Sequence, residues 1–457
     1  MKKPHHILVA GAGLVGSLLA LMLGRRGYRV TVLEKRADMR RVEMPGGRSI
    51  NLALAERGIH GLRMAGLMEE VEPLLIPMRG RMLHDRKGNL EFSPYGQRPD
   101  EVIYSVSRGE LNQLMMTAAE THFDVDVLFN QSVETVDFKK NRVLIKDHVC
   151  DKTTSLEFEL LIGADGVGSE VRTALLEANG GRCTIDMLDH DYKELSIPPA
   201  MAGDSLWQME REALHIWPRG GYMLIALPNL DGSFTVTLFL PGKGVPSFEL
   251  IDEPHELDQF FDEQFADARA LIPDFQQEYF GNPIGQLGTV RCDRWIYQDR
   301  AMILGDASHG VVPFHGQGMN AGFEDCSELC RLLDAHDDDW SAVMPEFERI
   351  RIPNANAIAD MALENYITMR DSVTDEKFQL KKEVGFELER RYPDLFIPRY
   401  SMVMFHRIPY ADVYARGLVQ EEILTGLCEN IDSATALDRD RANELVTSRL
   451  EPVMLPV

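Results

Sequence analysis

A glycine-rich turn near the N-terminus constrains the fold of this chain more than any other feature. Gly11, Gly13 and Gly16 form a GxGxxG motif between two apolar stretches at 7–10 and 17–23. A further apolar run at 30–33 ends in Glu34, 18 residues beyond the last glycine of the motif. This order predicts strand, turn, helix and strand, in which glycines let a pyrophosphate approach the helix N-terminus and the acidic side chain accepts from a ribose hydroxyl. We therefore predict a Rossmann-like unit that binds an adenine dinucleotide; the alternative is a turn with a purely structural role.

The rest of the chain predicts a discontinuous α/β fold. Short alternating segments broken by Gly and Pro fill 71–105, and a β-rich stretch with clear alternation at 233–239 follows later. Between them, a helix at 108–120 and strands at 125–129, 143–145 and 160–163 return to the first pattern, as do a strand at 301–304 and a helix at 318–333. We expect a nucleotide-binding domain of 1–70, 106–180 and 290–330, a β-sheet substrate domain of 71–105 and 181–289, and a C-terminal helical region of 331–457.

Charge and composition exclude several classes of function. The chain has 48 basic and 72 acidic residues, a formal charge of −24 that would repel a nucleic-acid backbone. An anionic substrate would therefore need particular arginines to hold it. No run of about 18 apolar residues occurs, so we expect no membrane partner and a cytoplasmic location. The six cysteines lack metal-ligand spacing, which predicts reduced structural thiols and no metal site.

A second glycine-rich turn lies far downstream, in LGDASH at 304–309 and PFHGQGMN at 313–320. It joins an apolar strand to a helix, so Asp306 could accept from a ribityl hydroxyl of a flavin, and the helix N-terminus near Gly318 could face the flavin ring. The alternative is an Asp N-cap and an ordinary loop. With GADG at 163–166, these turns resemble in their order the motifs of the para-hydroxybenzoate hydroxylase-type flavoprotein monooxygenases. A single GxGxxG argues against a separate NADPH domain.

Five further segments resemble the branch of that family that hydroxylates kynurenine: RSINLAL at 48–54, MRGRM at 78–82, PFHGQGMN at 313–320, ALENY at 362–366 and PRYSM at 398–402. The resemblance implies tightly bound, non-covalent FAD, with NADPH and dioxygen as co-substrates. It implies hydroxylation of L-kynurenine to 3-hydroxykynurenine, in tryptophan catabolism, through a flavin C4a-hydroperoxide. No phenol-deprotonating base is then needed, because the ring amine already donates electrons.

The resemblance also assigns residues. It implies that the substrate's carboxylate and amine are held by Arg81, Tyr95, Asn365 and Tyr400. Besides the three glycines of the first turn, it implies FAD contacts from Val15, Leu33, Glu34, Lys35, Arg36, Ala53, Arg108, Asp165, Asp306, Gly318, Met319 and Asn320. The pocket for the substrate ring would be lined by Phe239, Phe314, His315 and Gln317.

Elementary chemistry supports one of these assignments independently. In a net acidic protein, a carboxylate is held best by a bidentate guanidinium in a desolvated cleft, and Arg81 could supply it. The alternative is an ordinary surface arginine, which the pattern alone would favour. The other three residues would be packing residues on pattern alone, and His315 could be a hydrogen-bonded loop histidine without a chemical role.

Two other functions remain open from the sequence. One is a related flavin hydroxylase that acts on a phenol or a benzoate. The other is a flavoprotein interaction module whose partner binding follows its redox state, for which the acidic run at 334–339 is the one candidate docking segment. We interpret that run as a solvated loop.

Overall fold

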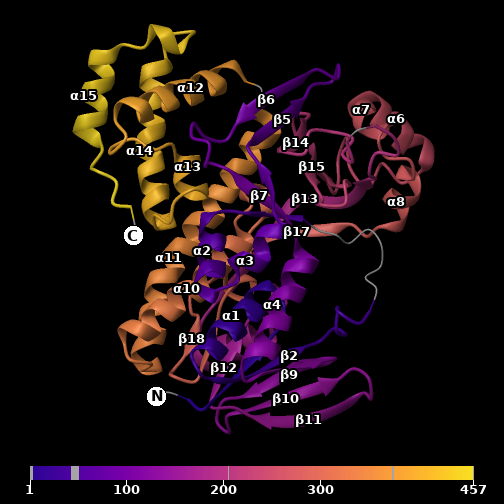
Figure 1. Cartoon of the computed structure of the whole chain (residues 1–457), viewed down its shortest axis with the longest axis vertical. Helices are drawn as coiled ribbons and strands as arrows, with labels where there is room; N and C mark the ends of the chain where they lie inside the picture. The colour runs from indigo at the N-terminus through magenta and orange to yellow at the C-terminus, as the bar shows by residue number, and fades with distance from the viewer. Residues whose placement is uncertain (1–3, 43–50, 204, 373–374, 456–457) are drawn as a thin grey trace. The chain divides into compact units, whose positions relative to one another are not determined.

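A computed structural model describes residues 4–42, 51–203, 205–372 and 375–455 (Figure 1). The chain forms two compact units: unit 1 comprises 1–75, 106–188 and 288–359, and unit 2 comprises 76–105, 189–287 and 360–457. The division into three parts that we expect from the sequence stays a prediction. Of the segments that carry the family resemblance, residues 48–50 lie outside the described residues.

Unit 1 is built on a six-stranded sheet in the order β18-β19-β12-β1-β2-β8. Its strands are β1 (His6–Ala10), β2 (Arg29–Glu34), β8 (Val125–Phe129), β12 (Leu160–Gly163), β18 (Ile296–Tyr297) and β19 (Ala301–Ile303). All neighbours are parallel except β18 and β19. The sequence of β1 and β12 is continuously apolar because helices cover both faces of such a sheet, and Leu8 and Leu161, which pair in register, are both fully buried.

Helices flank this sheet in the order that the sequence predicts. α1 (Leu14–Arg25) connects β1 to β2 and packs against α4 (Arg108–His122) and α10 (Gly318–Ala335), while α10 also packs on α2 (Glu56–Ala65) (Figure 1). The unit also contains β3 (Asn51–Leu54), α3 (Met68–Val71), η1 (Glu72–Leu74), α5 (Glu170–Asn179), α9 (Asp306–His309), η2 (Pro313–His315) and the first part of α11 (Trp340–Ile367). The expected βαβ unit and the FAD-binding α/β fold class are confirmed.

A small antiparallel sheet in unit 1 contains two strands that our sequence analysis did not predict. Its order is β11-β10-β9, with β9 (Gln131–Asp137), β10 (Arg142–Asp147) and β11 (Lys152–Glu157). Only the middle strand has the apolar alternation that identifies a half-buried strand. The polar segment of β11 is exposed at almost every residue, so no apolar period marks it.

The acidic run at 334–339 is not simply a solvated loop, which corrects our interpretation. Its first residue, Asp334, still belongs to α10. The Asp338 carboxylate accepts hydrogen bonds from Arg26 at 3.0 Å and from the Tyr28 hydroxyl at 2.8 Å. The run therefore holds the end of α1 through a partly buried ion pair, and part of its charge serves structure.

Unit 2 contains a seven-stranded sheet in the order β17-β13-β16-β15-β14-β5-β6. The strands are β5 (Gly80–His84), β6 (Leu90–Pro94), β13 (Cys183–Ile197), β14 (Ala213–Pro218), β15 (Met223–Pro228), β16 (Phe234–Pro241) and β17 (Gly285–Cys292). β4 (Ile76–Met78) pairs antiparallel with β7 (Ile103–Ser107) in a three-stranded sheet of order β3-β7-β4. The chain passes between the two units five times: before β4 and within β7, β13, β17 and α11.

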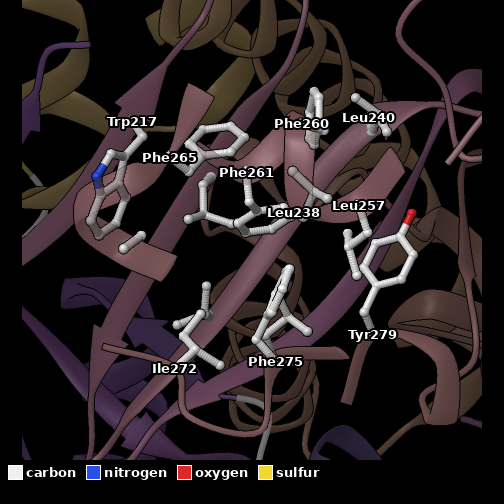
Figure 2. Packing of buried hydrophobic residues seen from close by; sticks show 14 of the residues in the cluster. Trp217, Leu238, Leu240, Leu257, Phe260, Phe261, Phe265, Ile272, Phe275 and Tyr279 are labelled. Carbon is white, nitrogen blue, oxygen red and sulfur yellow. The ribbon is translucent and has the colours of Figure 1, made fainter. Parts of the chain in front are cut away.

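One face of this sheet is covered by helices α6 (Pro254–Gln264), α7 (Ala266–Arg269) and α8 (Phe275–Gly281). Alternation along β16 places Val236, Leu238 and Leu240 on that face, where they meet a cluster of aromatic side chains (Figure 2). Phe261 and Phe265 of this cluster are fully buried and their ring centroids lie 5.4 Å apart. Burial of these large side chains anchors the helices to the sheet.

A polar chain runs beside this aromatic cluster. The Asp267 carboxylate lies 2.8 Å from Nδ1 of His84 and accepts from the indole N–H of Trp217, also at 2.8 Å. Nε2 of His84 lies 2.8 Å from Nδ1 of His215, whose Nε2 donates to the carbonyl of Glu210 at 2.8 Å. Every ring nitrogen of these two buried histidines has a hydrogen-bond partner, so burying the rings costs little desolvation free energy.

Helices form the remainder of unit 2: the end of α11, η3 (Thr368–Ser372), α12 (Glu376–Arg391), α13 (Arg399–Met404), α14 (Tyr410–Cys428), η4 (Ala434–Ala436) and α15 (Arg439–Arg449). Leu380 and Val384 of α12 pack with Ile423 of α14 and Val446 of α15 in a separate apolar cluster. Among the described residues, no helix has the length and hydrophobicity needed to cross a bilayer, and no group of His, Cys, Asp or Glu is arranged to hold a metal ion.

Candidate active site

The first glycine turn in unit 1 leaves room for a ligand at one position. Gly11 has a φ of 97°, and a Cβ there would collide with the carbonyl of Ala164, while a Cβ at Gly16 would collide with the carbonyl of Gly11. These two glycines thus allow close packing of the GxGxxG turn on the 163–166 turn. Gly13 differs, because a Cβ there would meet no protein atom within 4 Å. It stands at the N-terminus of α1, where no side chain caps the free N–H groups, so the opening suits a pyrophosphate.

Glu34 ends β2 beside this turn. Its carboxylate accepts from the N–H of Ala12 at 2.9 Å and from Nε of Arg36 at 2.7 Å. Burial alone would raise the pKa of Glu34, but these hydrogen bonds and the Arg36 charge bring it below its usual value. The side chain is therefore an ionised acceptor at the position where a ribose hydroxyl is bound in dinucleotide folds.

The second turn in unit 1 presents a carboxylate that has no partner. Gly305 has φ 59° and ψ −146°, a conformation that side chains disfavour, and it brings Asp306 to the start of α9. Asp306 is exposed and makes no hydrogen bond with another described residue. It is free to accept from a ligand hydroxyl.

A buried ionic cluster that our sequence analysis missed supports this turn. Asp325 on α10 is fully buried and accepts from the N–H of Gly305 at 2.9 Å, from Nε2 of His309 at 2.5 Å and from Nε of Arg351 at 2.7 Å. Burial would raise the pKa of Asp325, but the charges of His309 and Arg351 lower it. A sequence signal did exist, since Asp325 interrupts the apolar face of a helix, but its partners cannot be inferred locally.

Three other predicted FAD residues differ in whether their side chains are available to a ligand. Arg108 is exposed at the start of α4 without an ion-pair partner among the described residues, so its charge is available to a phosphate. The Asn320 amide is fully used, because it donates to the carbonyls of Ala53 and Gly316 and accepts from the N–H of Ala55. The Asp165 carboxylate accepts from Ser169 and from the N-terminus of α5. For Asn320, backbone N–H at the uncapped start of α10 is what a ligand could contact.

The remaining predicted FAD and ring-pocket residues are distributed as follows. Val15 packs against Gly305, which joins the two turns of unit 1. Gly318 and Met319 begin α10, and Leu33, Lys35 and Ala53 lie at or next to the ends of β2 and β3. Of the ring-pocket residues, Phe314 and His315 are buried in η2 and Gln317 is buried at the N-cap of α10 in unit 1, whereas Phe239 is buried on β16 of unit 2.

Unit 2 brings three of the four predicted substrate-binding residues together. The Arg81 guanidinium on β5 lies over the rings of Tyr95, 5.6 Å from its centroid, and Tyr400, at 5.1 Å. The two rings are stacked, with centroids 5.4 Å apart. Asn365 lies on α11, where its amide donates to the sulfur of Met369 at 3.4 Å.

Arg81 lacks an anionic partner. Within the described parts of the chain, no carboxylate forms an ion pair with it, and both its Nε and the Tyr95 hydroxyl are buried without a hydrogen-bond partner. Burial raises the pKa of both tyrosines, so their hydroxyls are neutral donors. A partly buried cation with an unused donor costs free energy unless something pairs with it, so this arrangement is suited to a ligand carboxylate.

The two sites differ in what they can do chemically. The unit 1 turns offer backbone N–H groups, a free cation and two carboxylates, which fit the pyrophosphate and hydroxyl groups of FAD. The unit 2 site offers a cation and neutral donors, which fit an organic acid. The described residues assigned to the two sites include no carboxylate pair and no nucleophile beside a base.

These features define an FAD-binding protein, and the model of the FAD binding domain family matches residues 5–360. Two curated proteins, both named kynurenine 3-monooxygenase, are similar over nearly the whole chain. The protein from Myxococcus xanthus is 46% identical, covering 98% of this chain and 96% of its own, and that from Stenotrophomonas maltophilia is 47% identical, covering 94% of each. The chain therefore belongs to the kynurenine 3-monooxygenase family.

Solved structures support the fold alone. PqsL from Pseudomonas aeruginosa, in complex with 2-aminobenzoylacetate, has a TM-score of 0.64 at 23% identity, covering 80% of this chain and 97% of its own. The p-nitrophenol 4-monooxygenase from Pseudomonas putida has a TM-score of 0.65 at 17% identity, covering 85% and 94%. The predicted fold class agrees with both.

Proposed function

We propose that this chain hydroxylates L-kynurenine to 3-hydroxykynurenine, using FAD, NADPH and dioxygen. One NADPH, one proton and one dioxygen would be consumed for each product, with NADP⁺ and water released. The observation that supports an amino-acid substrate is the partly buried Arg81, which lies over two stacked tyrosine rings and has no carboxylate partner among the described residues. The name of the full-length relatives supplies the identity of that amino acid.

We infer that unit 1 holds the cofactor. Gly13 and the N-terminus of α1 would bind the pyrophosphate, together with Arg108. Glu34 would accept from the ribose and Asp306 from the ribityl chain. FAD bound there, tightly and without a covalent bond, would supply the activation of dioxygen. The other FAD residues named from the resemblance belong to the same proposal.

In the proposed reaction, the protein itself positions the substrate and encloses it. Arg81, with Tyr95, Tyr400 and Asn365, would fix the carboxylate and amine, which restricts the ring to one orientation. Phe239, Phe314, His315 and Gln317 would surround the ring and exclude water. We assign no proton transfer to His315, since the ring amine already activates the neighbouring carbon. A cytoplasmic location stays a prediction.

The test is product analysis. Purified protein loaded with FAD is mixed with NADPH and L-kynurenine in air, and products are separated by mass. We expect 3-hydroxykynurenine in proportion to the NADPH consumed. Salicylate and 4-hydroxybenzoate serve as comparison substrates, because each carries a carboxylate but no amino-acid group. Turnover of either in preference to L-kynurenine would contradict the proposal.

A further inference from the structure

A lysine that our sequence analysis did not single out lies beside the Arg81 site in unit 2. Lys382 is on α12, and its ammonium donates to the Ser93 hydroxyl at 2.6 Å and to the Pro94 carbonyl at 2.8 Å. Within the described parts of the chain it has no ion-pair partner. Its neighbour Lys381 points elsewhere and pairs with Glu421 at 2.6 Å.

The strand register places this ammonium near the guanidinium. β5 and β6 are antiparallel, and Arg81 is directly opposite Ser93. Opposite residues in such a pair share one face of the sheet, with Cβ atoms about 4.5–5.5 Å apart. Lys382 is therefore anchored to the side chain that stands across from Arg81, so two cations without carboxylate partners occur on one face.

The same helix also fixes the segment that carries Tyr95. Lys382 holds residues 93 and 94, immediately before this tyrosine. Two turns further along α12, Glu389 accepts from the Gln97 amide at 2.6 Å and pairs with Arg98 at 3.1 Å. α12 thus holds the chain on both sides of Tyr95, and Lys382 is its contact on the side of Arg81.

We propose that Lys382 is a positioning residue of the carboxylate site, which adds positive charge beside Arg81 and holds the strand end that leads to Tyr95. The inference rests on the proposed function, because it takes the ligand to be an amino acid bound through its carboxylate. Neutral Lys382 would keep part of the second role but lose the first, so the two contributions can be separated.

The charge on Lys382 makes binding depend on pH. Burial, and then the Arg81 charge, lower the pKa of Lys382 to about 8, while Glu91 acts in the opposite direction. A bound carboxylate favours the ammonium and would raise this pKa again. The ammonium is fully present only well below pH 8, so affinity should be constant at low pH and should weaken as pH rises through this value. The charged groups that act on the ammonium are Arg81 and Glu91, and the ring of Phe386 lies 5.6 Å from it.

The experiment compares Lys382→Gln with Lys381→Gln in FAD-loaded protein. Dissociation constants are measured for L-kynurenine and for its decarboxylated analogue, kynuramine, between pH 6.5 and 9.5. At low pH, we expect Lys382→Gln to raise the dissociation constant of L-kynurenine by about tenfold or more, as for loss of one charge in a partly buried site. The variant should also no longer lose affinity as pH rises through about 8. Kynuramine binding and the Lys381→Gln control should change by less than about twofold.

Other outcomes identify which idea fails. Equal weakening of both ligands, or an unchanged pH profile, would show that Lys382 acts on shape alone and would overturn the inference. Lys382→Arg keeps the positive charge, so the inference would also be overturned if this variant bound L-kynurenine as weakly as Lys382→Gln does. If wild-type protein binds benzoate but not L-kynurenine, with the same dependence on Lys382, the proposed substrate fails and the inference stands. If neither carboxylate binds, both fail.

Discussion

Replacing Arg81 with alanine tests the carboxylate site most directly. The guanidinium pairs with no carboxylate among the described residues, so the substitution breaks no internal ion pair. It removes two cation–π contacts with tyrosines, at about 0.5–1 kcal/mol each. The free energy of unfolding of the ligand-free protein should therefore fall by no more than about 2 kcal/mol.

Binding should suffer much more than folding. Without Arg81, the substrate carboxylate enters a partly buried site unpaired, which typically costs about 2–4 kcal/mol. This corresponds to a rise in the dissociation constant of roughly 30- to 1,000-fold. Because the carboxylate is remote from the reacting ring carbon, the Michaelis constant should rise more than kcat falls.

Arg79 provides the matched control. It lies two residues away, but its guanidinium is half exposed and pairs with Glu212 at 2.8 Å. Arg79→Ala should change the dissociation constant by less than about twofold, because exposed ion pairs contribute about 0–1 kcal/mol. Titration of each FAD-loaded variant with L-kynurenine, followed by flavin absorbance, measures the effect. The reasoning is refuted if Arg81→Ala binds like wild type, or if both variants lose affinity equally.

Three further predictions concern the cofactor turns and the core. Gly13→Ala should leave the melting temperature of the apoprotein nearly unchanged but raise the dissociation constant of FAD about tenfold or more, because the new methyl group enters the space that the ligand would occupy. A fluorescence titration in which the variant binds FAD as tightly as the wild type would contradict this. Asp325→Asn should destabilise the protein by about 3–5 kcal/mol in urea unfolding, because it uncouples buried Arg351, and a loss below 1 kcal/mol would count against it. Burial would raise the pKa of Asp267, but its bonds to His84 and Trp217 lower it, so its stabilising effect should disappear as pH falls through that depressed value. Asp267→Asn should be less stable by about 1–3 kcal/mol at pH 7 and show a flatter acid dependence; parallel acid curves would argue against this assignment.

The parts of the fold that the sequence predicted well are those whose signal is local. The turn from β1 into α1 combines apolar strands, glycines and an acidic residue within a short segment, and all of them have their expected places. The exposed strand β11 has no apolar period, so sequence reasoning missed it. Local signals also placed Asp306 directly after an apolar strand, but they did not predict the short helix α9 that begins there.

Contacts between distant segments were not accessible in the same way. Arg81 was assigned through a resemblance, because nothing in its neighbourhood distinguishes it from Arg79. Its distinction is the absence of a carboxylate partner, which only the fold reveals. Lys382 touches residues almost three hundred positions earlier, and the two lysines at 381 and 382 look equivalent until α12 is placed against β6.

The hydrogen-bond chain beside the aromatic core determines how many protons its two imidazoles share. The Asp267 carboxylate and the Glu210 carbonyl can only accept, and the contact between His84 and His215 needs one more hydrogen. Three ring N–H groups are thus required, whereas two neutral imidazoles carry two. Burial lowers the pKa of His215 to about 4, because a charged ring is disfavoured there. The hydrogen count of this chain therefore ties the charge of the imidazole pair to that of Asp267, and removing the carboxylate alone would leave the pair with a hydrogen that nothing accepts.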